Sequence, residues 1–320
     1  MTSSYAPYEP YDRGMLDTGD GNRIYWDVSG NPHGKPVVNL HGGPGAPGVP
    51  KPVRAWDPER FRVIRFDQRN CGRSTPHASD PAADMSLNTT EHLLSDMELL
   101  REHLGVDRWL VKGGSWGATL GLAYAERHPE RVTGMILISM MTSRRSEIDW
   151  LYRGAGRFAP EAWQRFRDGV PAADRDGDLL SAYARLMEDP DPAVRSKAAA
   201  DWMAWEDAVL SVAQDDTAPD HRNEASAADQ ACVRICAHYY SNAAWLDEGV
   251  LIQRAGQLAG IPGIIIQGRQ DLGCPPLTAW ELSQAWPDAR LVIVEDAGHG
   301  GSPAMGAEIQ KAIEQFADRP

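Results

Sequence analysis

Short runs of apolar residues recur in the first 138 residues and again after residue 263, and each of them stops at a polar or charged residue. They cover residues 23–28, 36–40, 61–66, 109–111, 132–138, 264–266 and 291–294. Runs of this length are typical of buried strands. Helical spacing of apolar residues predicts helices over 87–104, 118–128 and 305–316, the first with a cap within Asn88–Thr90. This alternation predicts a mostly parallel sheet that is covered on both faces.

The middle of the chain has a different pattern. Between residues 140 and 249 the short apolar strands disappear, and Ala, Arg, Asp and Trp become frequent. We therefore expect an α/β fold with a helical cap at 140–249, inserted between two core segments at 1–139 and 250–320. The polar stretch 215–229 is predicted to be a loop within this insertion.

A nucleophile motif follows one of the predicted strands. Gly113-x-Ser115-x-Gly117 lies between the strand at 109–111 and the helix at 118–128. The motif alone also arises by chance in glycine-rich chains, but the strand–turn–helix context is the one that a nucleophile elbow requires. In such a turn the serine backbone is strained, and glycine is needed on either side because other side chains would clash. We therefore predict Ser115 as a catalytic nucleophile.

A serine hydroxyl becomes nucleophilic only when a base takes its proton. Asp271 and His299 each follow a predicted strand, and they come after Ser115 in the order acid, then histidine. Both should lie at the carboxyl ends of their strands, where open α/β sheets build their sites. Glu295 and Asp296 are alternative acids, but they adjoin the histidine and come one strand too late. We predict His299 as the base and Asp271 as the carboxylate that orients it.

Acyl transfer also requires donors for a developing oxyanion. The amide of Trp116, directly after the predicted nucleophile, is one candidate. The loop at 41–45 reads His-Gly-Gly-Pro-Gly, and it follows another predicted strand. A plain tight turn would explain the glycines and proline but not the His-Gly-Gly opening at this place. We predict the Gly43 amide as the second donor.

The net charge, the first residues and the apolar runs limit the classes of function that the chain can have. The formal net charge is −13, and a surface this acidic repels phosphate backbones. The first residues lack a basic start and an apolar core, and no run approaches the ~18 apolar residues of a membrane span. We expect a soluble cytoplasmic protein that acts on a small molecule or short peptide and binds neither nucleic acid nor membranes. A homo-oligomer is compatible with the sequence.

The cysteines predict neither disulfides nor a metal site. There are four, Cys71, Cys232, Cys236 and Cys274, and free thiols are the default in a reducing compartment. Cys232 and Cys236 share a helical face, but only His238 is near them, and this is too few ligands for a metal. We expect no metal and no organic cofactor.

Taken together, these motifs resemble the proline iminopeptidase family of α/β hydrolases. The similarity also covers Gly-Asn-Arg-Ile-Tyr-Trp at 21–26, Asp-Gln-Arg-Asn at 67–70, the elbow at 113–120, Cys-Pro at 274–275 and Ala-Gly-His at 297–299. Asn70 replaces the usual glycine of the second segment. Gln270 replaces a tyrosine, and Gly300 a serine that often follows the histidine. The resemblance implies the α/β-hydrolase fold, a helical cap and release of amino-terminal proline.

The resemblance also identifies a substrate pocket in which this chain departs from the family. Two family glutamates bind the imino nitrogen, and Glu206, in a Trp-Glu pair, matches the first. Residues 236–240 read Cys-Ala-His-Tyr-Tyr where the family has Glu-Asn-His-Tyr-Phe, so Cys236 replaces the second glutamate. Met141 replaces a family phenylalanine, and we also place Tyr240 and Cys274 in the pocket. Glu206 also has a purely structural interpretation, as a helix glutamate.

Three functions remain open at this stage. The first is a prolyl aminopeptidase of relaxed or altered selectivity. The second is an esterase, lactonase or amidase for a non-peptide substrate, favoured by the more apolar and adaptable pocket that Met141 and Cys236 create. The third is a non-hydrolytic role, either a ligase-like or carbon–carbon coupling reaction or simple binding, which the intact triad disfavours.

Overall fold

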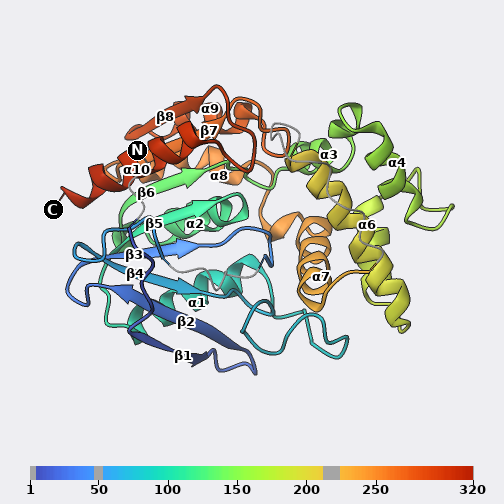
Figure 1. Cartoon of the computed structure of the whole chain (residues 1–320), viewed down its shortest axis with the longest axis horizontal. Coiled ribbons are helices and arrows are strands. Elements are labelled where there is room, and N and C mark those ends of the chain that lie inside the picture. The colour runs from blue at the N-terminus through green and yellow to red at the C-terminus, as the bar shows by residue number, and fades with distance from the viewer. Residues whose placement is uncertain (1–4, 47–52, 212–223, 320) are drawn as a thin grey trace.

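Eight strands form one sheet in the order β1-β2-β4-β3-β5-β6-β7-β8 (Figure 1). The structure is a computed structural model that describes residues 5–46, 53–211 and 224–319. The strands are β1 (Asp12–Asp17), β2 (Arg23–Gly30), β3 (Lys35–Leu40), β4 (Phe61–Phe66), β5 (Trp109–Gly114), β6 (Val132–Ile138), β7 (Gly263–Gly268) and β8 (Ala289–Val294). β1 and β2 pair antiparallel, and all pairings from β4 through β3 to β8 are parallel. The predicted mostly parallel α/β sheet is confirmed.

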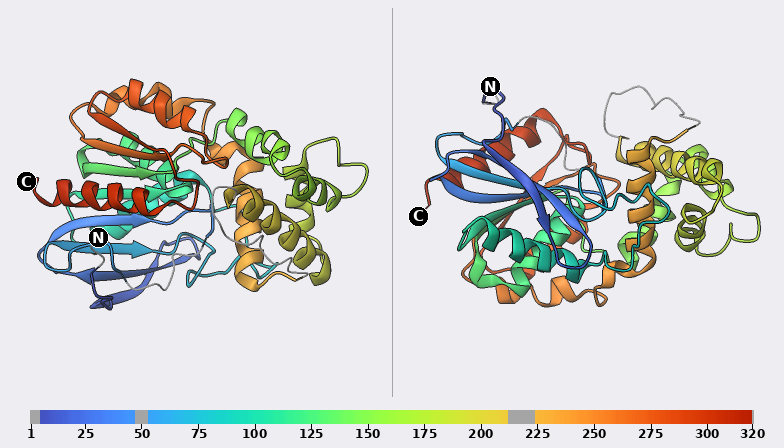
Figure 2. Two further views of the ribbon diagram at one scale, coloured as in Figure 1. Left: turned by 45° about the horizontal axis from the view of Figure 1, so that its top comes forward. Right: turned by 90° about the horizontal axis from the view of Figure 1, so that it is seen from below.

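Helices cover both faces of this sheet, because neighbouring residues of a buried strand point to opposite sides. Val38 and Met135 belong to the apolar cluster beneath the helices of one face, whereas Val37 and Ile136 belong to the cluster beneath the other. The first face carries α1 (Thr90–His103), α2 (Trp116–Arg127), α8 (Val250–Gln253) and α9 (Pro276–Ala285). The second carries α10 (Pro303–Ala317), as the two further views show (Figure 2).

A separate group of helices lies beyond the carboxyl ends of the parallel strands, at the right of Figure 1. It consists of α3 (Arg145–Tyr152), α4 (Pro160–Asp168), α5 (Leu179–Met187), α6 (Pro192–Leu210) and α7 (Ala227–Ser241), all from the chain between β6 and β7. Its own apolar core includes the packed rings of Phe166, Tyr183, Trp202 and Trp205. We call this group the cap. The division of the chain at residues 140 and 249 stays a prediction.

Some local predictions differ from the structure. β1 and α9 were not predicted from the apolar pattern. The helix expected at 87–104 begins at Thr90, and its N-cap residue Thr89 makes no side-chain capping bond. Asn88 instead turns inward, where its amide donates to the Arg69 carbonyl (3.1 Å). The polar stretch expected to be a loop is helical from Ala227 onward, and residues 212–223 lie outside the described part of the chain.

Two predictions about the chain as a whole can be compared with the structure. All four cysteines carry free, buried thiols, as expected. Within the described residues, none of the helices combines the length and apolar character that crossing a lipid bilayer requires.

Candidate active site

The turn between β5 and α2 has the geometry of a nucleophile elbow. Ser115 lies directly before α2 with φ 53° and ψ −127°, a backbone conformation that non-glycine residues rarely adopt. A Cβ atom on Gly113 would lie 2.1 Å from the Gly117 carbonyl oxygen, and one on Gly117 would lie 2.5 Å from the Leu40 oxygen. Both glycines are therefore required for the chain to turn here. The turn leaves Ser115 half-buried at the carboxyl edge of the sheet.

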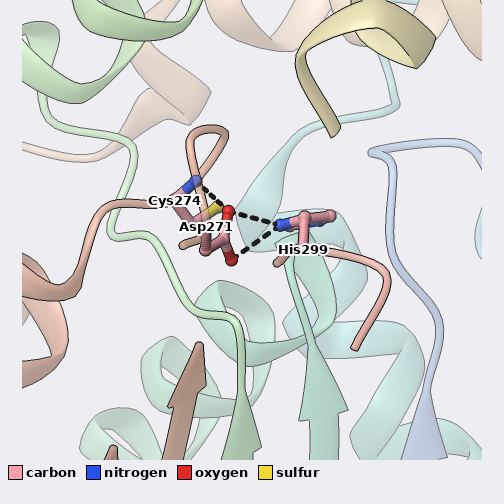
Figure 3. Close-up of side chains that lie close together, drawn as sticks. All are labelled: Asp271, Cys274 and His299. Carbon is pink, nitrogen blue, oxygen red and sulfur yellow. Dashed lines mark hydrogen bonds and ion pairs between the residues drawn. The ribbon is translucent and has the colours of Figure 1, made fainter. Parts of the chain in front are cut away.

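An acid–histidine pair lies at the ends of the neighbouring strands. Asp271 follows β7 and His299 follows β8, and His299 Nδ1 is 3.1 Å from Asp271 Oδ1 and 3.0 Å from Oδ2 (Figure 3). The Cys274 amide donates to Oδ1 at 2.7 Å, and Gln267 Nε2 donates to Oδ2 at 3.2 Å. The aspartate is fully buried and held on several sides, so it can fix the orientation of the imidazole.

The environment of His299 makes it a stronger base than a free imidazole. Burial alone would lower its pKa, but the hydrogen bond and charge of Asp271, together with the charge of Glu206, outweigh burial and raise the pKa above its ordinary value. In the described ranges, no hydrogen bond joins the Ser115 hydroxyl to this imidazole. Catalytic hydrogen bonds are often long before substrate binds.

Two backbone amides are available near Ser115. The Trp116 amide is in the first turn of α2, where amides have no partner within the helix. Gly43 has φ 115°, and in the described chain its amide donates to no other group. Its neighbour Gly42 approaches the nucleophile so closely that an added Cβ would lie 3.5 Å from Ser115 Cβ. The oxyanion loop therefore lies directly against the elbow.

Gln68 joins this loop to the elbow, a role that was not predicted from the sequence. Its amide donates to His41 Nε2 (2.9 Å), and its side chain donates to the His41 carbonyl (3.0 Å). The Trp116 indole in turn donates to Gln68 Oε1 (2.8 Å). Burial lowers the pKa of His41, which keeps the ring neutral and able to accept the amide. One side chain thus holds the two predicted oxyanion donors in a fixed relation.

Glu206 points into the same region from α6. Its Oε1 accepts two hydrogen bonds, from the Tyr152 hydroxyl (2.5 Å) and from the Trp202 indole (2.8 Å). Within the described chain, Oε2 accepts none. Burial raises the pKa of Glu206, although the two donors act against this shift. The arrangement holds the carboxylate in place and leaves one oxygen available to a ligand.

The end of α6 packs directly over the acid–histidine pair. A Cβ on Gly273 would lie 2.3 Å from Leu210 Cδ2 and 3.6 Å from His299 Nδ1. Leu210 is one helical turn after Glu206, and the charge of Glu206 raises the pKa of His299. The structure therefore brings Glu206 close to the candidate catalytic groups, as a substrate-binding role requires.

Cys236 turns toward the oxyanion loop from α7. Its thiol donates to the Pro44 carbonyl at 3.0 Å, and Cys232, one turn earlier, lies 3.8 Å from the same oxygen. The neighbouring Cys232 thiol and burial raise the pKa of Cys236 well above its ordinary value. Position 236 therefore carries a neutral, engaged thiol where the resemblance implied a second carboxylate.

The other predicted pocket residues share one apolar cluster with Cys236. Met141, Tyr240 and Cys274 are all buried in it. The Tyr240 hydroxyl donates to the Gly43 carbonyl (3.1 Å) and lies 3.5 Å from Met141 Sδ. Cys274 joins the pocket to the acid through its amide. The structure thus brings the predicted pocket residues and the predicted catalytic residues together at one place.

Comparisons with known proteins agree with this geometry. The family model described as alpha/beta hydrolase fold matches residues 35–302. A probable proline iminopeptidase of Streptomyces coelicolor is 46% identical and covers 98% of both chains. A proline iminopeptidase of Xylella fastidiosa is 44% identical over 93% of this chain and 94% of its own. The chain belongs to the proline iminopeptidase family. A crystal structure of the Mycobacterium smegmatis enzyme shares the fold at 20% identity, with a TM-score of 0.57 over 96% of this chain and 99% of that one.

Membership of the proline iminopeptidase family makes the protein a hydrolase.

The structure explains one of the departures from the family. Asn70 has φ 64°, a left-handed conformation that glycine favours and asparagine tolerates. Its side chain also donates to the Pro76 carbonyl (2.9 Å). Asparagine is therefore compatible with the backbone conformation of this turn. Cys236 differs, since it changes the charge of the pocket.

Asp271, Cys274 and His299 also form a potential metal-ligand set, because one ligand atom from each lies within 4.8 Å of the others. The sequence predicted no metal here. In the structure, His299 Nδ1 is within hydrogen-bond distance of both oxygens of Asp271. Because a carboxylate can only accept, this nitrogen carries the proton and cannot bind a metal while it donates to Asp271. The arrangement fits an acid–histidine pair better than a metal site.

Tyr152, Trp202 and Gln68 are the residues that sequence reasoning missed. Tyr152 and Trp202 hold Glu206, and Gln68 holds the oxyanion loop. Gln68 lies in a family segment quoted from the sequence, and Trp202 precedes Glu206 by four residues, which is one helical turn. Tyr152 carried no signal, because it reaches the site only through the packing of α3 against α6.

Proposed function

We propose that this hydrolase removes an amino-terminal proline, or a closely similar cyclic amine, from short peptides and amides through an acyl-enzyme. The observation that carries the proposal is the free Oε2 of Glu206, held beside the catalytic groups by Tyr152 and Trp202. A carboxylate with one open oxygen in a largely buried pocket is suited to pair with a substrate ammonium group.

In this mechanism Ser115 attacks the carbonyl carbon of the first residue while His299 accepts its proton. The tetrahedral oxyanion accepts hydrogen bonds from the Trp116 and Gly43 amides. His299 then donates the proton to the leaving amine, the C–N bond breaks and an acyl-serine remains. Water, deprotonated by His299, hydrolyses the ester and regenerates Ser115. Asp271 keeps the imidazole in the tautomer that both steps need.

A second function is favoured by one observation, the neutral and apolar side of the pocket formed by Cys236 and Met141. This surface would suit an uncharged acyl group, and the enzyme would then act as an esterase, lactonase or amidase on a non-peptide substrate. Under that function, Cys236→Glu should create turnover of proline amides that the natural protein lacks.

The two functions are distinguished by substrates that differ only in charge. We would compare proline 4-nitroanilide with cyclopentanecarboxylic 4-nitroanilide, in which a methylene group replaces the ring nitrogen, and with a short-chain 4-nitrophenyl ester. The peptidase proposal expects strong preference for the proline compound and no turnover by Ser115→Ala. Equal rates for the two anilides, or turnover of esters alone, would favour the second function.

A further inference from the structure

A pocket of about 210 Å³ opens to the surface, apart from the catalytic groups. Its lining residues come from α1, α2 and the segment that returns from the cap to the core, on the helical face of the sheet that α10 does not cover. Part of its wall is apolar, formed by Leu94, Ala123, Leu246 and Val250. The cavity has no part in the mechanism above.

Glu126 lines this cavity, and in the described part of the chain its carboxyl group has no hydrogen-bond partner. Its Oε1 is buried and, within the described chain, forms no hydrogen bond. The other charged groups that line the cavity are Glu91 on α1, Arg127 on α2, and Asp247 and Arg254 on the return segment. Glu91 is already paired with Arg127 at 2.6 Å. Arg254 acts on Glu126 only through its charge, because no described ion pair joins them.

Trp245 forms an aromatic part of the wall. Its side chain is 41% exposed although its ring packs on Tyr239, with 5.2 Å between ring centroids. It belongs to three consecutive left-handed residues, Ala243, Ala244 and Trp245, with φ 46°, 52° and 52°. The Thr90 hydroxyl fixes this turn by donating to the Ala244 carbonyl at 2.6 Å. Left-handed backbone is unfavourable for such residues, so the turn persists only because its surroundings impose it.

We propose that this cavity binds an organic ammonium ion, with Glu126 as the partner of the charge and Trp245 beside the hydrocarbon part. The Glu126 carboxylate supplies the charge, and an indole ring and aliphatic side chains supply the apolar contacts. A hard metal ion would need several oxygen ligands, and these walls do not offer them. Once Glu126 is ionised, three carboxylates face two guanidinium groups, and the lining is then unfavourable for an anion.

The proposal predicts that binding is linked to proton release. Burial raises the pKa of Glu126 to about 8, so at pH 7 the free protein holds it mostly protonated. An ammonium ion binds the ionised form, and the complex must therefore lose a proton when it forms below pH 8. Affinity should rise with pH from 6.5 to 8.5, roughly tenfold or more, until the ligand itself deprotonates.

Isothermal titration calorimetry with butylammonium chloride tests the site, with butanol as the neutral probe. The protein should carry Glu206→Gln, so that an amine cannot pair with the carboxylate of the catalytic pocket. We expect one saturable site for butylammonium, and heats that differ between buffers of different ionisation enthalpy. Adding Glu126→Gln should weaken binding by about tenfold or more, and Trp245→Ala should also weaken it.

Glu91→Gln is the matched control, because this carboxylate lines the same cavity but is already paired with an arginine. It should leave the affinity unchanged. Glu126→Gln removes an unpartnered buried charge, so its unfolding temperature at pH 8.5 should equal or exceed that of the parent. Equal affinity with and without Glu126, or equal affinity for butanol and butylammonium, would overturn the proposal.

Discussion

Replacing Glu206 by glutamine tests the pocket most directly, because it removes a charge and keeps the shape. The glutamine oxygen can still accept from Tyr152 and Trp202, so the helices that these residues join should remain packed. What is lost is the pairing of Oε2 with a substrate ammonium group. The change therefore isolates the electrostatic contribution of one oxygen.

The size of the effect follows from the geometry. One ion pair at about 4 Å with an effective dielectric constant near 20 contributes about 4 kcal/mol. Truncating one partner of a buried charge pair costs about 2–5 kcal/mol in measured complexes. Glu206 is half-buried, so we take about 3 kcal/mol, which corresponds to a loss of roughly 150-fold in kcat/KM.

The assay measures kcat/KM for proline 4-nitroanilide and for its cyclopentane analogue across a full pH profile. The profile is needed because Glu206 also raises the pKa of His299. The proline compound should lose roughly 150-fold at the plateau, whereas the analogue should be unaffected. Asp201→Asn on the same helix is the control, since Asp201 forms an exposed pair with Lys197 (2.5 Å) and should affect neither substrate.

Two outcomes would refute this reasoning. If both substrates slow equally, Glu206 acts through the fold or through the histidine and not through a substrate charge. If neither slows, no ammonium group pairs with this carboxylate.

Three further predictions concern the catalytic groups. Ser115→Ala should lower kcat by about 10⁴–10⁶-fold and abolish labelling by a fluorophosphonate while the unfolding temperature is retained; continued labelling would exclude it as the nucleophile. Activity should rise with pH, with a midpoint above ~6.5, because the base must be neutral and the pKa of His299 is raised. Glu206→Gln should shift that midpoint to lower pH. A midpoint below ~6.5 in the natural protein would contradict the assignment of His299 as the base. Gln68→Leu should lower kcat by about tenfold with little change in KM. Trp116→Phe removes the same hydrogen bond and should have the same effect. An effect on KM alone would instead assign Gln68 to substrate binding.

The signals that predict the candidate catalytic residues are local in the sequence. A strained turn demands glycine beside Ser115, and the acid and histidine follow strand ends in a fixed order. The apolar alternation likewise predicted the parallel strands, which are buried on both faces. β1 was missed because its pattern is that of an exposed edge, with buried and polar positions poorly separated. An element can therefore be predicted from sequence only where its own residues show a clear pattern of apolar and polar positions.

The substrate pocket was harder to predict, because its contacts depend on how separate helices meet. Glu206 was predicted through the family resemblance. Its partner Tyr152 comes from α3, and no sequence signal near Glu206 indicates that the two residues meet. The hydrogen bond from Cys236 to the Pro44 carbonyl was also beyond prediction, since it joins residues 192 positions apart in the chain. Side chains that act on another segment can be assigned only when the packing is known.

The contacts between α7 and the oxyanion loop limit how substrate selectivity can evolve or be engineered in this protein. Tyr240 and Cys236 hold two successive carbonyls of that loop, and Ile235 lies so close to Gly45 that an added Cβ would be 2.8 Å from it. The predicted wall of the substrate pocket therefore also supports the predicted oxyanion loop. Changes on this helix should therefore alter substrate preference and turnover together.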